Sequence, residues 1–146
     1  MIVNIKLTEE GAVIPTLGSE KAAGADLYAN LNTNGICIAP GETVMVSTGV
    51  AVSIPDGYAG LVYARSGIAS KRGLAPANKV GVIDSDYTGT IYVALHNHSK
   101  QVQRIENHER IAQLVIAPVV LPEWDVVDEL ETTARGAGGF GSSGKN

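Results

Sequence analysis

The sequence predicts an all-β fold of the sandwich, jelly-roll or barrel type with one short helix. Short apolar segments alternate with polar residues at the period of a β-strand. Turn signals separate these segments at short intervals. Glycine contributes 17 of 146 residues, about 12% compared with a typical share of roughly 7%, so the fold needs many unusual backbone conformations.

The N-terminal half contains three predicted strand regions. Residues 3–7 alternate apolar and polar side chains, as in a strand with one buried face. Residues 36–38 and 43–54 are rich in β-branched side chains, which favour extended backbone. Pro-Gly at 40–41 and Pro-Asp-Gly at 55–57 follow these two segments. Each of the two therefore ends at a turn.

The remaining predicted elements are four strands and one helix. The strands are expected at residues 58–63, 80–83, 90–95 and 110–120. Residues 66–72 lack strand alternation and form the helix, with Ser66 as N-cap and Gly73 in a left-handed conformation after its end. No repeat with a period of about 20 to 50 residues is present, which excludes a solenoid or propeller.

Length and composition predict one domain with a short arm. A chain of 146 residues can bury one core but is short for two ordinary domains. Residues 132–146 include five glycines and a single large apolar side chain, Phe140, so they cannot build a core. We therefore expect a β domain over residues 1–131 and a flexible Gly-rich arm over residues 132–146.

Charge and hydropathy limit the partners and the compartment. A net charge of -4 and a pI near 5.3 give no positive field that would attract nucleic acid or an anionic membrane. No apolar run reaches the roughly 18 to 20 residues that cross a bilayer, so we expect a soluble, cytoplasmic protein. The single cysteine, Cys37, lies between Ile36 and Ile38 and is expected to be buried in a reducing compartment.

The predicted arm contains residues that can bind phosphate. Residues 139–145 have the spacing G-x-x-x-x-G-K of a P-loop, but Asn146 stands where Ser or Thr is needed, so a P-loop NTPase is not expected. The glycines still let backbone N–H groups face an anion, and Arg135, Ser142 and Ser143 add donors. The segment is either a phosphate-closing lid or a frayed terminus.

Two segments of the predicted domain carry side chains suited to a polar site. Residues 65–67, Arg-Ser-Gly, put a guanidinium, a hydroxyl and a bare N–H at the start of the helix, as an anion site or as an ordinary cap. Residues 81–89 predict a β-hairpin with Asp84, Asp86 and Tyr87 at its tip. These side chains serve either turn formation or a carboxylate that orients water beside an aromatic plane.

Single polar residues also lie among apolar neighbours. Asp26 follows Ala-Gly-Ala and either caps a turn or serves a site. Gln113 lies inside an apolar strand and needs hydrogen-bond partners if it is buried. His96 and His98 would place two imidazoles on one strand face, but without a third ligand nearby we do not expect zinc.

Taken in order, five segments resemble the motifs of the trimeric dUTPase family. They are 23–27 (AGADL), 64–69 (ARSGIA), 78–89 (NKVGVIDSDYTG), 110–114 (RIAQL) and 135–144 (RGAGGFGSSG). One motif alone is weak, whereas five in this order over nearly the whole chain are highly specific. Ala64 stands where Pro is usual, Thr88 where Arg or another polar residue is common and Ser143 where Thr is frequent, and none of these departures removes a catalytic group.

The resemblance implies a jelly-roll-like β-sandwich or barrel that assembles as a homotrimer. Three active sites would lie at subunit boundaries, each drawing on all three chains. One chain would supply Asp26, residues 65–67 and Gln113, and a second would supply residues 78–87. The third would lend its C-terminal arm, which orders over the bound nucleotide of a neighbour.

The implied reaction is hydrolysis of dUTP to dUMP and pyrophosphate with Mg2+ on the triphosphate, which keeps uracil out of DNA and supplies dUMP for thymidylate synthesis. Asp84 would be the base that activates water for attack on the α-phosphorus. Asp26 would hold Mg2+ in its outer shell through water. The residues expected to hold phosphates are Arg65, Ser66, Gly67, Gln113, Arg135, Ser142 and Ser143, and Gly141 is assigned to substrate binding with the arm.

The resemblance also implies how uracil is selected. Backbone groups at Gly81 and Ile83 and the amide of Asn78 would match the edge of uracil and mismatch that of cytosine. Tyr87 would lie under the deoxyribose, where a 2'-hydroxyl would clash. Phe140 would stack on the uracil as the arm closes.

Two other interpretations stay open. A dCTP deaminase, or a bifunctional deaminase-diphosphatase of the same fold, needs an acid/base residue at the amino carbon of the pyrimidine, and residues 78–89 contain no additional Glu. A non-catalytic nucleotide-binding trimer predicts loss of Asp84 or of the arm, and both are present.

Overall fold

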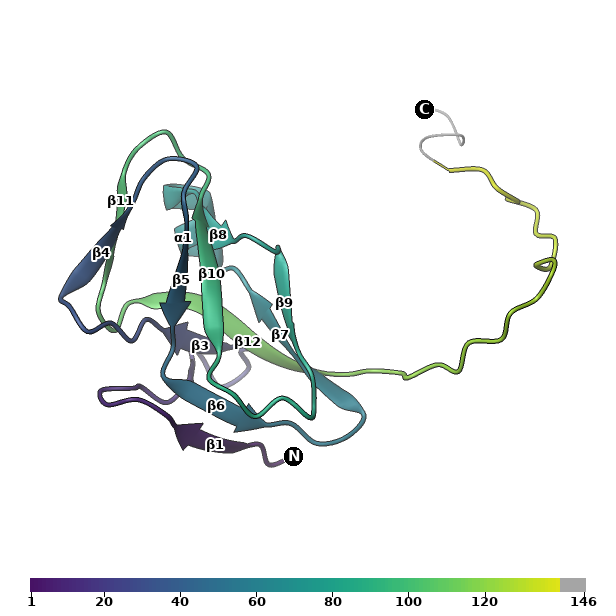
Figure 1. The fold of residues 1–146 in the computed structure, drawn as a ribbon, viewed down its shortest axis with the longest axis horizontal. Coiled ribbons are helices and arrows are strands. Elements are labelled where there is room, and N and C mark those ends of the chain that lie inside the picture. The colour runs from purple at the N-terminus through teal and green to yellow at the C-terminus, as the bar shows by residue number, and fades with distance from the viewer. Residues whose placement is uncertain (140–146) are drawn as a thin grey trace.

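Short antiparallel strands dominate the structure, a computed structural model that describes residues 1–139 (Figure 1). Its elements are β1 (Asn4–Leu7), β2 (Thr16–Leu17), β3 (Ala25–Tyr28), β4 (Gly35–Ile38), β5 (Thr43–Ser47), β6 (Val50–Ser53), β7 (Tyr58–Tyr63), α1 (Ser66–Arg72), β8 (Leu74–Pro76), β9 (Val80–Ile83), β10 (Tyr92–Asn97), β11 (Gln103–Glu106) and β12 (Arg110–Pro118). The prediction of an all-β fold with one short helix is confirmed for this part of the chain. Within residues 1–139, no helix is long and apolar enough to span a membrane.

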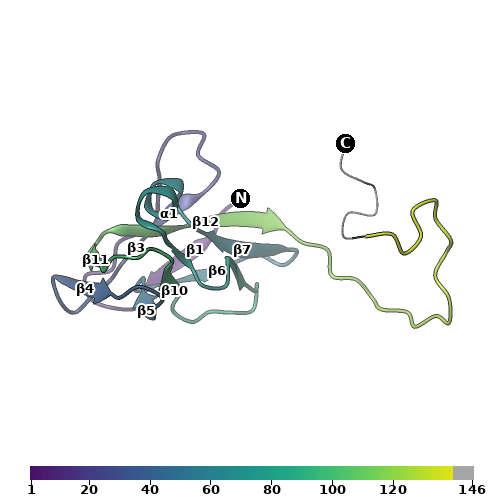
Figure 2. The ribbon, with the colours of Figure 1, turned by 90° about the horizontal axis from the view of Figure 1, so that it is seen from above.

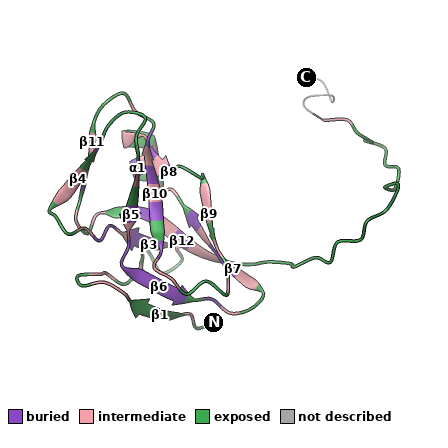
Figure 3. Cartoon of the chain, in the orientation of Figure 1, coloured by how far each residue is buried: buried purple, intermediate pink, exposed green. Residues whose placement is uncertain are grey.

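The strands form four antiparallel sheets around one core. The largest has the order β2-β3-β12-β7-β9, and a three-stranded sheet has the order β5-β10-β8. Two further pairs, β1 with β6 and β11 with β4, complete the body. Side chains from all four sheets meet in one core. Figure 3 colours the buried residues purple along the ribbon. The largest fully buried ones include Leu27, Ile38, Leu74, Leu95 and Ile111, each contributing about 1.5–3 kcal/mol relative to exposure.

The predicted helix has the expected bounds but a different cap. Gly73 ends it with a φ of 67°, as expected for the left-handed position. The N-cap is Arg65, whose φ of -82° and ψ of 134° are extended, and no side-chain hydrogen bond caps the helix. The assignment of Ser66 as N-cap was therefore wrong. The Ser66 side chain is exposed.

The predicted β-hairpin over residues 81–89 was also wrong. β9 ends at Ile83 and pairs with β7, from Tyr63↔Val80 to Gly60↔Ile83. β10 pairs with β5 on one side and with β8 on the other, so neither of its edges is open to β9. The segment from Asp84 to Gly89 is therefore a loop that carries the chain from one sheet to another, and we call it the crossover loop.

Three smaller differences from the sequence expectations have local causes. The predicted strand at 43–54 is divided into β5 and β6 at Gly49, whose φ of 66° interrupts the extended backbone. Cys37 is exposed, because strand alternation turns it outward while Ile38 faces the core. The prediction of a buried Cys37 was wrong. The short strands β2, β8 and β11 lie in segments without a marked strand pattern.

After β12 the chain leaves the body, as Figures 1 and 2 show. Residues 119–139 contain no strand or helix and extend away from the sheets. Large apolar side chains lie exposed along this segment, including Val120, Leu121, Trp124 and Val126. Apolar side chains that are this exposed, Trp124 and Val126 above all, are typical of a surface that contacts a partner.

Candidate functional site

Five of the predicted site residues line one cavity of about 420 Å³. They come from three elements: Asp26 from β3, Arg65, Ser66 and Gly67 from the start of α1, and Gln113 from β12. The pairing of β3 and β12 puts Asp26 directly beside Gln113, and Gln113 lies opposite Tyr63 at the end of β7. Since Arg65 follows β7 by two residues, the sheet register itself brings these groups together. We call this the phosphate-side cavity.

Asp26 is the electrostatic centre of the phosphate-side cavity. Its Oδ1 accepts a hydrogen bond from Arg65 Nε at 2.6 Å, and its Oδ2 accepts one from an Arg110 terminal nitrogen at 3.2 Å. The Asp26 side chain is 10% exposed, compared with 28% for Arg65 and 50% for Arg110. Two guanidinium groups thus flank one nearly buried carboxylate. Both arginines line the cavity and keep further N–H donors, which suits the cavity to a polyanion.

Gln113 is held in place by its backbone surroundings. Its side-chain Nε2 donates to the carbonyl of Ala64 at 2.9 Å. A Cβ atom on Gly24 would lie 2.8 Å from Gln113 Oε1, so only glycine at position 24 lets the amide approach this closely. The amide is therefore fixed at the edge of the cavity, immediately before the Arg65-Ser66 segment.

A second group of predicted residues lines a different cavity, of about 210 Å³. Asn78, Gly81 and Ile83 form one side of it, and β10 forms the other side with residues such as Tyr92. β9 is an edge strand paired only with β7, so half of its backbone N–H and C=O groups point away from that pairing. The Asn78 Nδ2 atom lies 3.4 Å from the place of a Cβ on Gly81, which puts amide and backbone donors side by side.

Asp84 and Tyr87 follow on the crossover loop and are both exposed. Asp84 lines a third cavity, of about 400 Å³, with Asp86 and Tyr58. The carbonyl of Asp84 accepts the Tyr87 N–H at 3.2 Å, which closes a turn between them. The loop therefore presents a free carboxylate and an aromatic ring next to the edge of β9.

The two groups of residues are separated within one chain. The register places Gln113, Tyr63 and Val80 in one row across β12, β7 and β9. Asp84 lies four residues further along, so the strand geometry separates it from Gln113 by roughly 16 Å. A catalytic base must come within about 3 Å of the proton it removes, directly or through one water. Asp84 and Gln113 of one chain therefore line separate cavities.

The family model for dUTPase matches residues 10–144 of the chain. The chain belongs to the dUTPase family. It is 51% identical over 148 residues to the deoxyuridine 5'-triphosphate nucleotidohydrolase of Escherichia phage T5, which covers 98% of this chain and 99% of that protein. It is 47% identical to the enzyme of the same name from Nautilia profundicola, which covers 99% of this chain and 100% of that protein.

Solved dUTPase structures share the fold. A single-substitution mutant of the Staphylococcus bacteriophage 80alpha dUTPase with dUpNHpp superposes with a TM-score of 0.86 at 33% identity, over 99% of both chains. A mutant dUTPase from phage phi11 of S. aureus, described for its coordination of a structural Mg(II) ion, has a TM-score of 0.81 at 28% identity, covering 90% of this chain and 100% of that one. The fold of this dUTPase family member is thus the family fold.

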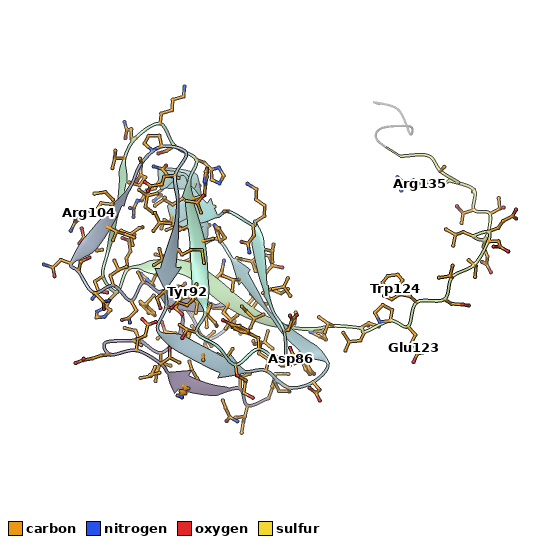
Figure 4. All side chains as sticks on the ribbon, viewed as in Figure 1. Asp86, Tyr92, Arg104, Glu123, Trp124 and Arg135 are labelled. Carbon is orange, nitrogen blue, oxygen red and sulfur yellow. The ribbon has the colours of Figure 1, made fainter. Side chains whose placement is uncertain are left out.

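Arg135 is the predicted arm residue that lies within the described part of the chain. Arg135 is exposed, donates from Nε to the carbonyl of Gly138 at 2.8 Å, and lies far from the body of its own chain (Figure 4). The structure does not bring it to either cavity. Phe140, Gly141, Ser142 and Ser143 lie outside the described residues.

Two residues of the phosphate-side cavity that had no predicted role contact the predicted ones. Gly24 makes room for the Gln113 amide, and Arg110 is the second partner of Asp26. Arg110 and Gln113 are three positions apart, which would put them on opposite faces of a regular strand. A register shift between Arg110 and Ala112 changes this alternation and brings both to the cavity.

Proposed function

We propose that this protein hydrolyses dUTP to dUMP and pyrophosphate at a site shared between copies of the chain. The reaction, dUTP hydrolysis, is that of the dUTPase family to which the chain belongs. The residue roles and the assembly are our proposal. One observation carries it: within each chain, Asp84 and the residues of the phosphate-side cavity line separate cavities.

The phosphate-side cavity is proposed to bind the triphosphate. Arg65 and Arg110 carry the positive charge, and their contact with Asp26 fixes both guanidinium groups before substrate arrives. The Ser66 hydroxyl, the Gly67 N–H and the Gln113 amide add neutral donors on the same cavity. Donors that are already in place stabilise the negative charge that develops on the leaving pyrophosphate, because the donors do not have to reorient during the reaction.

Asp84 is proposed to be the general base. Its carboxylate is exposed beside a cavity and has no side-chain partner among the described residues, so it is free to accept a proton from water. In the assembly, the Asp84 of one copy would lie next to the phosphate-side cavity of another. The attacking water would then be oriented toward the α-phosphorus, with pyrophosphate as leaving group.

The cavity between β9 and β10 is proposed to bind uracil. The open edge of β9 at Gly81 and Ile83, together with the Asn78 amide, can pair with the hydrogen-bonding edge of uracil. Cytosine has the reversed pattern at its amino group and would leave buried donors unpaired. Tyr87 would lie under the deoxyribose, and Phe140 of the arm would cover the base.

The side chains present suit a Mg2+ ion that arrives with the substrate. Among residues 1–139 no group of three or more His, Cys, Asp or Glu could hold a metal directly. Asp26 borders the phosphate-side cavity and has lone pairs left after its two ion pairs, so it would hold the hydrated ion through water. The bound ion would supply charge neutralisation on the triphosphate.

The proposed assembly is a homotrimer in which the arm crosses to a neighbour. Exposed apolar side chains on the segment that leads into the arm, such as Trp124 and Val126, need a surface that would cover them. The body carries a matching apolar groove of about 230 Å³, lined by residues that include Ile5, Ile14 and Leu114. Docking of the arm on a neighbouring copy would bury both and bring Arg135 to that copy's nucleotide. A cytoplasmic location remains part of this proposal.

The first measurement is release of pyrophosphate and nucleoside monophosphate from dUTP, dTTP, dCTP and UTP, each with Mg2+ and with a chelator. We expect Mg2+-dependent release of dUMP from dUTP alone. Uridine products from dCTP would instead indicate a deaminase of the same fold. No release from any of the four would indicate a nucleotide-binding protein and would overturn the proposed reaction.

Sharing of the site is tested by mixing two inactive variants. Asp84→Asn and Arg65→Ala chains are refolded separately and together, with Gln113→Ala as a second phosphate-side variant if Arg65→Ala does not fold. Random mixing should restore about a quarter of the active sites, because each such site combines intact halves from two chains. Activity no higher than that of the separate variants would show that one chain supplies both halves and would contradict the shared site.

A further inference from the structure

The aromatic ring of Tyr87 lies directly on the backbone of Gly89. A Cβ atom added to Gly89 would be 2.6 Å from Tyr87 Oη, 2.7 Å from Cζ and 3.1 Å from Cε2. Cβ atoms do not approach other heavy atoms so closely, so any residue larger than glycine at position 89 must displace the ring. The contact involves the phenol end of the ring.

The phenol group is anchored at the same place. Tyr87 Oη donates to the carbonyl of Thr90 at 2.9 Å. Thr90 is tied to the body, since its Oγ1 lies 2.8 Å from Thr8 Oγ1 and the next residue, Ile91, is 1% exposed and bonded through its N–H to the Val50 carbonyl at 2.8 Å. The ring is thus held from below by Gly89 and at its tip by a fixed carbonyl, although Tyr87 itself is on an exposed loop.

Space rather than backbone conformation is what requires glycine here. Gly89 is not among the residues with positive φ, so an alanine can adopt its backbone conformation without strain. Replacement of Gly89 by alanine should therefore have one main consequence, the displacement of the Tyr87 ring. This property makes position 89 a clean probe of ring placement.

We propose that Gly89 is a positioning residue that sets the plane of Tyr87 and thereby the discrimination between deoxyribose and ribose. The inference rests on the proposed role of Tyr87 under the sugar. A ring held flat against Gly89 presents one fixed surface, against which a 2'-hydroxyl has no room. A ring pushed away by a methyl group at position 89 loses part of its contact with deoxyribose and leaves space for the extra oxygen.

The test compares kcat and KM for dUTP and UTP in the full-length Gly89→Ala chain with those of the unmodified protein. The ratio of kcat/KM for dUTP to that for UTP should fall about three- to tenfold, on the scale of one aromatic contact. We expect the loss for dUTP mainly in KM, because Gly89 does not touch the proposed reacting atoms. Thr88→Ala, at the neighbouring exposed position of the same loop, is the matched control and should leave the ratio unchanged.

Combining Gly89→Ala with Tyr87→Ala separates an effect on the position of the ring from a general effect on the loop. In Tyr87→Ala chains, Gly89→Ala should change the dUTP to UTP ratio no further, since there is no ring left to displace. Circular dichroism and thermal unfolding check that each variant is folded. An unchanged ratio in Gly89→Ala, or an equal fall in the Tyr87→Ala background, would overturn the inference.

These outcomes are distinguishable from failure of the proposed function. If the unmodified protein does not hydrolyse dUTP, or if Tyr87→Ala leaves the ratio unchanged, then the function or the role of Tyr87 is wrong. If Tyr87→Ala relaxes sugar discrimination while Gly89→Ala does not, then only the positioning role of Gly89 is wrong.

Discussion

The phosphate-side cavity and the crossover loop place polar groups by different means. In the cavity, a carboxylate that is 10% exposed pairs with two guanidinium groups, and all three project from sheet strands or the residue that caps the helix. On the loop, Asp84 is exposed and Tyr87 is held through Gly89 and the Thr90 carbonyl. In the cavity, the binding groups therefore also stabilise the fold. On the loop, substitutions can change function with little effect on stability.

The strongest test of this difference is Asp84→Asn. The substitution keeps the shape of the side chain but removes the proposed base, so turnover of dUTP should fall at least about a hundredfold. Binding of a non-hydrolysable dUTP analogue and the unfolding temperature should change little, because Asp84 is exposed and lies on a loop outside the strands and the helix. Steady-state kinetics, calorimetric titration and thermal unfolding measure the three quantities.

Asp86→Asn is the matched control for this experiment. Asp86 lies on the same loop, borders the same cavity and is also exposed. Its replacement removes the same charge from the loop without touching the proposed base. A similar loss of turnover in both variants would point to the charge of the loop rather than to a base, and near-normal turnover in Asp84→Asn would contradict the assignment.

Asp26→Asn should show the opposite behaviour, a moderate loss of both stability and activity. The amide cannot balance the charges of Arg65 and Arg110, so about 1–3 kcal/mol of the free energy of unfolding should be lost. Urea unfolding monitored by circular dichroism measures this change. Glu106→Gln is the control, because it breaks the exposed Arg104–Glu106 pair, which contributes only about 0–1 kcal/mol. Equal free energies of unfolding of the two variants would show that the burial of Asp26 does not make its ion pairs more stabilising than an exposed pair.

The sequence was sufficient for the elements with strong local patterns and insufficient where two sheets meet. α1 and strands such as β7 and β12 were predictable because apolar spacing and turn residues define them. The route from β9 to β10 was not, since an apolar run on each side of a turn is equally compatible with a hairpin and with a crossover between sheets. Only the pairing partners of β10, which are distant in sequence, decide between them.

The candidate site shows the same limit. The residues of the phosphate-side cavity were identified through motifs, but the contribution of Arg110 depends on a register shift that no residue pattern announces. Likewise, nothing in the sequence 84–89 indicates that Gly89 supports a ring rather than a turn. A glycine can serve a turn or the close approach of another group, so the sequence alone does not show that Gly89 lies against a ring.

The smallest expected effect concerns the protonation of His98, the residue that follows β10. His98 has a pKa lowered from 6.5, first by desolvation and then by repulsion from His96 and Lys79. The folded protein therefore binds a proton at His98 less readily than the unfolded chain does. Stability should thus fall slightly as pH decreases through and below about 6.5, since proton uptake favours the unfolded state there.

Thermal unfolding of the unmodified and His98→Gln proteins between about pH 7.5 and about pH 5.5 measures this effect. The variant should lose less stability across the interval, because it lacks the group whose protonation favours unfolding. Lys79→Gln sharpens the test: removal of one repelling charge should raise the pKa of His98 in an NMR titration. A lower His98 pKa in that variant would contradict this prediction, because it would mean that Lys79 acts on the imidazole otherwise than by charge.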